Sequence, residues 1–323
     1  MELLDPKNDY VFKRLFADSP ELLAELISAV RYDEPPVEVL QVLNPQILPE
    51  DITGKAIELD VLARDSRGRL FNVEVQVQRF PHWSARSAYY LSRLLGSQID
   101  AGQAYVDLKP VVGVHLLDFD LFDEHPSALW HFEMRDRHDP AVRLGDELSL
   151  HVVELRKADR QMRRRGDDDG GGVAAVPAGA GTQSALAAWI AFLERWKENS
   201  EMSDVTYPPV QQALKKLQAL SLNEEDRYRA IARERALYNE LTLLRHAREE
   251  GREEGREEGR EEGRQEGLAL AKASALDRLL TRRFGPLPPW ATLRLQQATP
   301  EQLDTWLDRV LDTPTLQAVL DGP

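Results

Sequence analysis

The sequence of 323 residues contains no cysteine. Disulfide bridges and cysteine-based zinc sites are therefore excluded. No apolar run approaches the roughly 18 residues that a membrane span requires. The first residues, MELLDPKNDYVFKRLF, also lack a basic segment followed by an apolar one, as a secretion signal would have. These absences predict a cytoplasmic protein. The hydrophobic content of 42% is sufficient for a sizeable core, and the length allows two domains.

An excess of basic side chains is missing as well. The formal net charge is −14, and residues 1–165 contain 21 Lys and Arg against 28 Asp and Glu. Proteins that hold DNA through its phosphates usually present a basic surface. The composition therefore argues against tight non-specific binding of nucleic acid, while it leaves local contacts by individual arginines open.

Two strand-like runs, residues 57–64 and 70–78, are separated by a short polar turn. A three-residue hairpin loop in which Gly68 takes a positive φ would join them. In that register Asp60 faces Glu74 across the hairpin. The sequence therefore predicts that two carboxylates lie side by side on neighbouring strands.

The two faces of this hairpin differ in character because side chains alternate along a strand. One face is apolar throughout, and the other carries the polar residues Glu58, Asp60, Asn72, Glu74, Gln76 and Gln78. Directly opposed side chains have Cβ atoms about 5 Å apart, so like charges there are destabilising. A divalent cation would offset them, and oxygen ligands from carboxylates and an amide suit Mg²⁺. The alternative is a polar face that is simply solvated.

The spacing Asp60-x13-Glu74-x-Gln76, within ELDVLARDSRGRLFNVEVQVQ, resembles the metal-binding core of the PD-(D/E)XK nucleases. It is most similar to the branch known as recombination-promoting nucleases, or transposases. Further segments resemble that branch in the same order: NDYVFKRLF, RSAYYLSRLLGSQIDAGQAY, LKPVVGVHLLDFDLF and the Gly-Glu-rich tract from residue 249 onward. The resemblance implies a restriction-endonuclease-like α/β fold, which is a mixed sheet flanked by helices, followed by an all-α C-terminal region.

The resemblance also implies a role for each residue of the motif. Asp60 and Glu74 would bind Mg²⁺, or Mn²⁺ or Ca²⁺ in its place, and Gln76 occupies the position where the superfamily more often has Lys. A lysine helps to orient and activate the attacking water as a cation, whereas an amide only forms hydrogen bonds. Glu58 would be an outer ligand or a base. Asp9 would add an outer carboxylate, although it also suits the N-cap of the helix DYVFKRLF.

The implied activity is that of a metal-dependent DNA endonuclease, which hydrolyses phosphodiester bonds and promotes recombination or transposition. Arg64, Arg67, Arg69 and Arg86 are the candidate contacts to DNA phosphates. Two alternatives stay open. One is a catalytically inactive nucleic-acid-binding or assembly module of the same fold, which Gln76 and the acidic composition favour. The other is a nuclease that acts on RNA.

The organisation of the nuclease-like region follows from its hydrophobic periodicity. Helical spacing over residues 8–30 precedes a first core strand near residues 37–42. After the hairpin, residues 83–102 predict a crossover helix and residues 111–117 the next strand. A last strand at residues 150–155 brings the predicted sheet to five strands.

The whole chain is expected to divide into five parts. These are a nuclease-like domain (1–160), a flexible Gly/Asp/Ala linker or loop (161–182), helices that pack on the nuclease domain (183–247), an Arg-Glu-Glu-Gly repeat (248–267) and a small helical C-terminal domain (268–323). The last part resembles a domain of unknown function that recurs at the C-terminus of related bacterial proteins.

The Arg-Glu-Glu-Gly repeat places a glycine at every fourth position. On a helix these glycines form a slowly turning stripe without side chains. Each Gly costs roughly 1 kcal/mol relative to Ala, which is more than an i,i+3 Glu–Arg pair returns. The helix would therefore need a second helix against the stripe, supplied by another copy of the chain in a homo-oligomer. A charged, extended spacer is the alternative.

Overall fold

A computed structural model of the protein describes residues 2–43, 46–47, 57–58, 60–100, 102–167, 182–198 and 205–321. The chain forms two compact units, Met1–Leu237 and Tyr238–Pro323. In the described ranges, no helix combines the length and the apolar character that crossing a membrane requires.

The first unit is built around a six-stranded mixed sheet with the strand order β1-β4-β5-β6-β8-β7. Its strands are β1 (Val39–Leu43), β4 (Val61–Asp65), β5 (Leu70–Gln76), β6 (Val111–Leu117), β7 (Leu129–Glu133) and β8 (Leu148–Glu154). β5, β6 and β8 run parallel to one another. β1 pairs antiparallel with β4, β4 with β5, and β7 with β8. This architecture confirms the expected mixed α/β fold.

The prediction of five strands is wrong by one edge strand. β7 pairs with β8 at the end of the sheet, and the alternation in its sequence LWHFE spans only residues 130–133, which is too short to distinguish it from the loops around it. A strand at the edge buries fewer of its side chains, so its hydrophobic pattern is weak.

The predicted continuous strand over residues 57–64 is also divided. Residues 57–58 form β3 (Ile57–Glu58), which pairs with β2 (Gln46–Ile47) in a separate two-stranded sheet. β4 begins only at Val61. Asp60 therefore lies in a bend directly before β4 and not within a strand.

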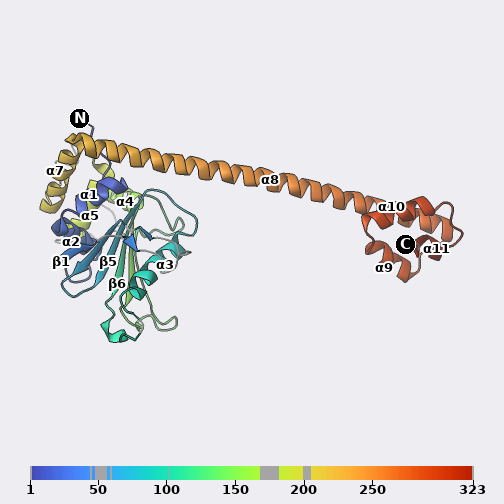
Figure 1. Ribbon diagram of the computed structural model, residues 1–323, viewed down its shortest axis with the longest axis horizontal. Helices are drawn as coiled ribbons and strands as arrows, with labels where there is room; N and C mark the ends of the chain where they lie inside the picture. Colours follow the sequence, from blue (N-terminus) through green and yellow to red (C-terminus); the bar gives the residue numbers. More distant parts are fainter. Residues whose placement is uncertain are drawn as a thin grey trace. The chain divides into compact units, whose positions relative to one another are not determined.

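Helices cover both faces of the sheet (Figure 1). One face is covered by α1 (Asp9–Phe16), α2 (Pro20–Val30) and α5 (Thr182–Arg195), with α7 (Pro208–Leu222) beside them. The other face is covered by α3 (Trp83–Gly96). The helix α4 (Leu155–Asp167) follows β8 directly in the chain. The apolar stripe of α5 enters the largest hydrophobic core, which contains among others Phe12, Phe71, Val73, Trp189 and Phe192.

The register of the sheet assigns each side chain to one of these faces. Val73 pairs with Val114, which in turn pairs with His151, and the two valines belong to the core beneath α1, α2 and α5. Glu74 pairs with His115 in the next rung, so both side chains lie on the opposite face, beneath α3. Consecutive residues of a strand, such as Val73 and Glu74, thus lie on opposite faces of the sheet.

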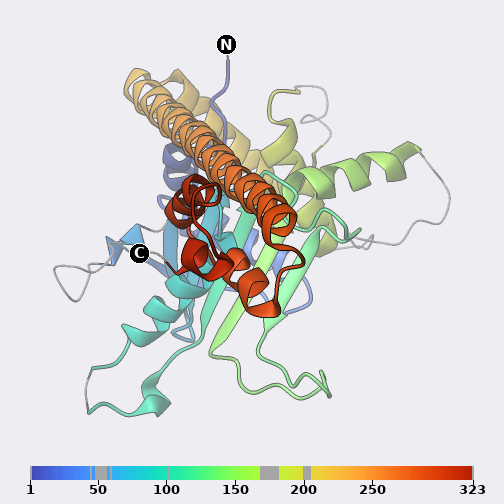
Figure 2. The same cartoon turned by 90° about the vertical axis from the view of Figure 1, so that its right-hand side faces the viewer.

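Several turns gather at one end of the sheet. Figures 1 and 2 show that the loop containing the short helix η1 (Tyr105–Asp107) and the loop between β7 and β8 extend from the same end. The β4–β5 turn lies there as well, because Leu70 N donates to Pro110 O at 2.9 Å. Gly68 in this turn has φ of +82°, as the sequence predicts for the hairpin loop.

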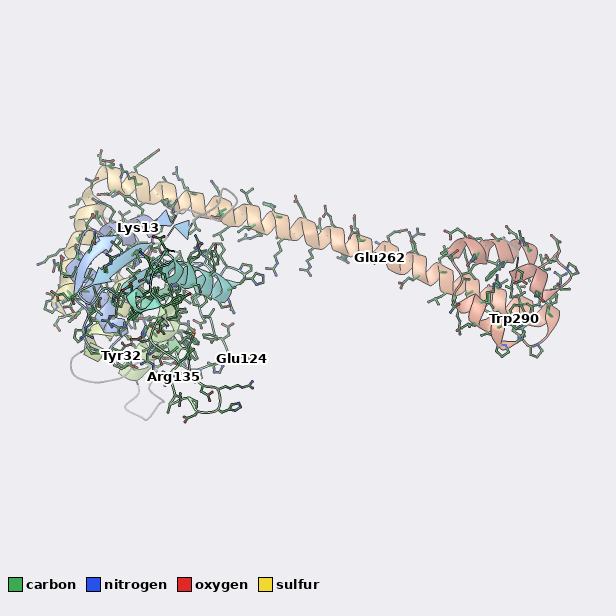
Figure 3. The ribbon with its side chains drawn as sticks, turned by 60° about the horizontal axis from the view of Figure 1, so that its bottom comes forward. Lys13, Tyr32, Glu124, Arg135, Glu262 and Trp290 are labelled. Atoms are coloured by element: carbon green, nitrogen blue, oxygen red, sulfur yellow. The ribbon has the colours of Figure 1, made fainter. Side chains whose placement is uncertain are left out.

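The long helix α8 (Glu224–Phe284) contains the whole Arg-Glu-Glu-Gly tract. The tract is therefore helical and not an extended spacer. For Gly251, Gly255, Gly259, Gly263 and Gly267, no atom outside the adjoining residues and backbone of the helix itself lies within 4 Å of the position that a Cβ would take, as far as the described residues extend. Glu262, labelled in Figure 3, is one of the exposed side chains of this helix.

The second unit contains the larger part of α8, from Tyr238 onward, together with α9 (Pro289–Gln296), α10 (Pro300–Arg309) and α11 (Leu316–Leu320). α10 begins with a capping box, in which Thr299 and Gln302 each bind the backbone amide of the other. The helices enclose a small core that includes Leu276, Leu280, Leu303, Trp306 and Val319.

Candidate metal-binding active site

Asp60 is held in place by the strand beside it. Val75 N donates a hydrogen bond of 3.0 Å to Asp60 Oδ2. The predicted hairpin register is observed in the pairing of Val61 with Val73, and its continuation by one residue brings Asp60 beside Glu74. The amide of Val75 thus donates to a side-chain carboxylate and not to a backbone carbonyl. The backbone hydrogen-bond pattern between the two strands ends at this point.

Glu74 lies beneath α3 with only 7% of its surface exposed. Asn72 Nδ2 donates a hydrogen bond of 2.9 Å to Glu74 Oε1. Asn72 is fully buried, and none of the described residues provides a hydrogen-bond partner for its Oδ1. The alternative of a solvated polar face is therefore wrong for these two residues. The carboxylate of Glu74 is buried beside the side-chain oxygen of Asn72.

The two carboxylates disturb each other electrostatically. Burial, together with the negative charge of Glu74, raises the pKa of Asp60 to about 7. The positive charge of Lys13, labelled in Figure 3, and the hydrogen bond from Val75 oppose this rise. A group at this position gains from a cation, because the cation would favour the ionised carboxylate.

Gln76 ends β5 on the same face as Glu74. Its Nε2 is buried and has no hydrogen-bond partner in the described part of the chain. A buried donor without an acceptor costs about 1–3 kcal/mol, so this amide fits a site where a bound acceptor oxygen completes the hydrogen bond. Asp60, Glu74 and Gln76 are thus brought to one part of the sheet, as the motif predicts.

His115 is a neighbour of Glu74 that the sequence did not reveal. Its ring is 1% exposed, Nδ1 lies 3.3 Å from Ser87 Oγ, and Trp83 contacts it edge-on with 5.5 Å between ring centroids. Burial lowers the pKa of His115, and the charge of Glu74 opposes this shift. His115 can be placed beside Glu74 only when the parallel register of β5 and β6 is known, because that register pairs the two residues.

The predicted arginine contacts do not gather around the carboxylates. Arg67 and Arg69 lie in the β4–β5 turn, where Asp65 Oδ1 accepts from their backbone amides at 3.0 and 2.8 Å. Arg69 Nε also donates to Asp65 Oδ2 at 2.7 Å. Five residues of extended chain separate Asp60 from this turn, which is on the order of 16 Å. Arg64, on β4, is exposed close to the same turn.

Arg86 is the exception among the four arginines. It is exposed on the first part of α3, and its guanidinium lies over the ring of Tyr90 at 5.1 Å from the centroid. Its charge helps to lower the pKa of His115. Arg86 is therefore the predicted contact residue that lies near the carboxylate pair.

The two accessory carboxylates have different outcomes. Asp9 is not the N-cap of α1, because the side chain of Asn8 accepts from the amides of Tyr10 and Val11. Asp9 Oδ2 instead accepts from Arg233 Nε at 2.7 Å, while its charge raises the pKa of Asp60. The side chain of Glu58 lies outside the described residues.

A second group of potential ligands lies elsewhere in the first unit. Among the described residues, Glu34, His131 and His151 place one ligand atom each within 4.8 Å of one another. His151 shares its face with Val73 and Val114, not with Glu74. This group is therefore separate from the carboxylate pair.

Comparison with known proteins identifies the family. The family model described as PD-(D/E)XK nuclease family transposase matches residues 6–247. The chain therefore belongs to this family, which confirms the resemblance seen in the motif and supports a nuclease-like function on nucleic acid that uses a divalent metal. No curated protein and no solved structure matches the chain. The match ends at residue 247, so the resemblance of the C-terminal domain stays a prediction.

Proposed function

We propose that this protein is a metal-dependent DNA endonuclease that hydrolyses phosphodiester bonds, with Asp60 and Glu74 as metal ligands. The observation that carries the proposal is the pair itself. Two carboxylates lie side by side at the covered face of a sheet, and burial together with the charge of Glu74 raises the pKa of Asp60. Such an arrangement costs stability unless a cation binds, so it is better explained by a ligand site than by packing.

The donor set fits a hard divalent cation. Two carboxylates and the unused Oδ1 of Asn72 offer oxygen atoms only, which is the chemistry that Mg²⁺ and Mn²⁺ accept. When bound, the ion would supply Lewis-acid polarisation of a phosphodiester and a water of lowered pKa. Glu74 is fixed for this task by the amide of Asn72, and Asp60 by the amide of Val75.

The remaining groups position the reactants. Gln76 Nε2, which has no acceptor among the described residues, would hold the attacking water or a phosphate oxygen by a hydrogen bond. It carries no charge, so it orients the water without stabilising developing negative charge as a lysine would. Arg86, exposed nearby on α3, would pair with a phosphate of the bound strand.

A plasmid-nicking assay tests the proposal. The purified chain is expected to nick supercoiled DNA with Mg²⁺ or Mn²⁺ and not with EDTA, whereas Ca²⁺ would support binding with little or no cleavage. Asp60→Ala is expected to remove the activity. Asp107→Ala is a matched control, because Asp107 is an exposed aspartate at the far end of the sheet. Cleavage retained in purified Asp60→Ala protein would overturn the assignment.

The inactive binding or assembly module is the second candidate, and Gln76 together with the net charge of −14 favours it. Retention of DNA by the wild-type protein in a gel-shift assay, without nicking under any metal, would support this reading. A parallel assay with RNA of the same sequence separates a DNA nuclease from an RNA nuclease. A role in recombination or transposition extends the proposal and is supported by the family alone.

A further inference from the structure

Glu34, His131 and His151 come together from three separate elements at one edge of the sheet. His131 of β7 pairs directly with His151 of β8 across the strands. Their rings stack with 3.9 Å between centroids and 22° between planes. Glu34, in the segment that follows α2, reaches the same point, where Oε1 lies 3.5 Å from His151 Nε2.

The polar atoms of this group are not all satisfied within the protein. His151 is 3% exposed, and its Nε2 has no hydrogen-bond partner among the described residues. The nearest acceptor is Glu34 Oε1 at 3.5 Å, which is the upper limit for a hydrogen bond, so this buried ring nitrogen is only weakly satisfied. An ion between the two groups would satisfy both of them.

We propose that Glu34, His131 and His151 form a second metal site, which binds a first-row transition-metal ion such as Zn²⁺. Two imidazoles and one carboxylate are a ligand set that Zn²⁺ accepts, with water in the fourth position. Mg²⁺ does not suit this set, because it prefers oxygen ligands alone. The proposal goes beyond the nuclease function, since the residues lie on the face of the sheet opposite to Glu74.

The surroundings provide both access and orientation. The side chains of Glu34 and His131 are 31% and 29% exposed, which leaves a path for the ion and its water. Arg31 Nη2 is paired with Glu34 Oε2, so Oε1 is left to face His151. Glu133 Oε1 lies 3.5 Å from His131 Nε2, and a carboxylate beside a ligand imidazole commonly fixes its orientation.

Metal binding would require a small contraction of the site. Zinc–ligand bonds of about 2.0–2.1 Å place the ligand atoms of a tetrahedral site roughly 3.4 Å apart. The separation of 3.5 Å between Glu34 Oε1 and His151 Nε2 already matches this value. The three ligand atoms lie within 4.8 Å of one another, and rotation of the partly exposed side chain of His131 would supply the remaining difference. The bound ion would join the segment after α2 to the edge strand β7, so it would also stabilise this edge of the sheet.

The test measures binding and not cleavage. The full-length protein, stripped of metal, is titrated with Zn²⁺ by calorimetry and with Co²⁺ by visible absorption. We expect one zinc ion per chain from this site and the intense absorption of tetrahedral Co²⁺. His131→Asn and Glu34→Gln are expected to weaken zinc binding by more than about tenfold, as loss of a ligand does. His138→Asn, which changes an exposed histidine of the following loop, should bind as the wild type does.

The Asp60→Ala/Glu74→Ala double variant separates this inference from the proposed active site. It should keep the zinc affinity and the cobalt spectrum, whatever its activity. Equal zinc affinity in His131→Asn, Glu34→Gln and His138→Asn would overturn the second site and show a hydrogen-bonded Glu–His pair only. Zinc binding that disappears in the double variant would likewise assign the ion to the nuclease site.

Discussion

The backbone amide of Val75 holds the carboxylate of Asp60 through a hydrogen bond of 3.0 Å. The strand that carries Glu74 therefore also positions the residue that faces it, and the separation of the two carboxylates is fixed by one element. The side chain of Asp60 has no freedom to turn away from Glu74 without giving up this bond. The repulsion between the two groups is thus built into the fold.

The first prediction follows from this repulsion. Either Asp60→Ala or Glu74→Ala should abolish metal-dependent cleavage, because each removes one of the two proposed ligands. The folded structure should persist, and the melting temperature in EDTA should be unchanged or higher, since a buried like-charge pair is removed. Circular dichroism and thermal melts in EDTA check this. A large drop in melting temperature for Asp60→Ala would show that the carboxylate has a structural role instead.

The second prediction concerns pH. The pKa of Asp60 is about 7 in the folded protein and 3.8 ordinarily, so between these values the folded state holds a proton that the unfolded state has lost. Stability in EDTA should therefore fall as the pH rises from about 4 to about 7, by the contribution of this group. Asp60→Asn cannot titrate and should lose this part of the pH dependence. Urea unfolding of both proteins across this range measures the difference, and parallel profiles would contradict the assigned pKa.

Much of the fold is predictable from the sequence, because its central strands are buried and regular. The alternation around Gly68 gives the register of β4 and β5, and the apolar run at residues 111–117 gives β6. The edge strand β7 escapes prediction because half-exposed strands have weak patterns. The break before Val61 escapes it too, since a hydrogen bond from a backbone amide to the side chain of Asp60 leaves no trace in hydrophobicity.

The residues of the candidate site also differ in how far the sequence predicts their positions. Neighbours within one hairpin, such as Asp60 and Glu74, follow from the spacing alone. His115 joins them only through the parallel pairing of β5 with β6, which no local pattern specifies. Arg67 and Arg69 lie at the tip of the hairpin, as the predicted turn requires, and therefore at the other end of the strand from Asp60, and their contact with DNA phosphates stays a prediction. Distance along a strand matters as much as the face on which a side chain lies.

The third prediction tests Gln76. If its amide only positions water, Gln76→Lys should retain or increase cleavage, because a cation at this place also stabilises developing negative charge. Gln76→Ala should lose much of the activity, since the free donor at Nε2 disappears. Single-turnover rates with saturating Mg²⁺ compare the three proteins. Equal rates in all of them would show that Gln76 takes no part in the reaction.

The fourth prediction concerns the close contact between α3 and the sheet. A Cβ at Gly113 would lie 2.7 Å from Leu150 Cδ1 and 3.2 Å from Leu91 Cδ1. Gly113→Ala should therefore destabilise the protein by about 1–3 kcal/mol, as overpacking does. Gly96→Ala is the matched control, because nothing lies within 4 Å of its Cβ position. Chemical denaturation measures both variants, and equal stabilities would show that the side chains of Leu150 and Leu91 move aside without cost.

The last prediction concerns the glycine stripe of α8, which stays without a contact in the described chain. Replacing Gly255, Gly259 and Gly263 by Ala should raise the helicity, because about 3 kcal/mol of propensity penalty is removed in total. Replacing the same residues by Leu keeps a good helix former but blocks the close approach of a second helix. If the stripe joins two copies of the chain, the Leu variant should show a lower mass in light scattering than the wild type. The Ala variant adds only a methyl group at each site, so its mass shows how closely the two helices approach each other. An unchanged mass in the Leu variant would rule out assembly through the glycines, and the nuclease-like unit would then act alone or pair through another surface.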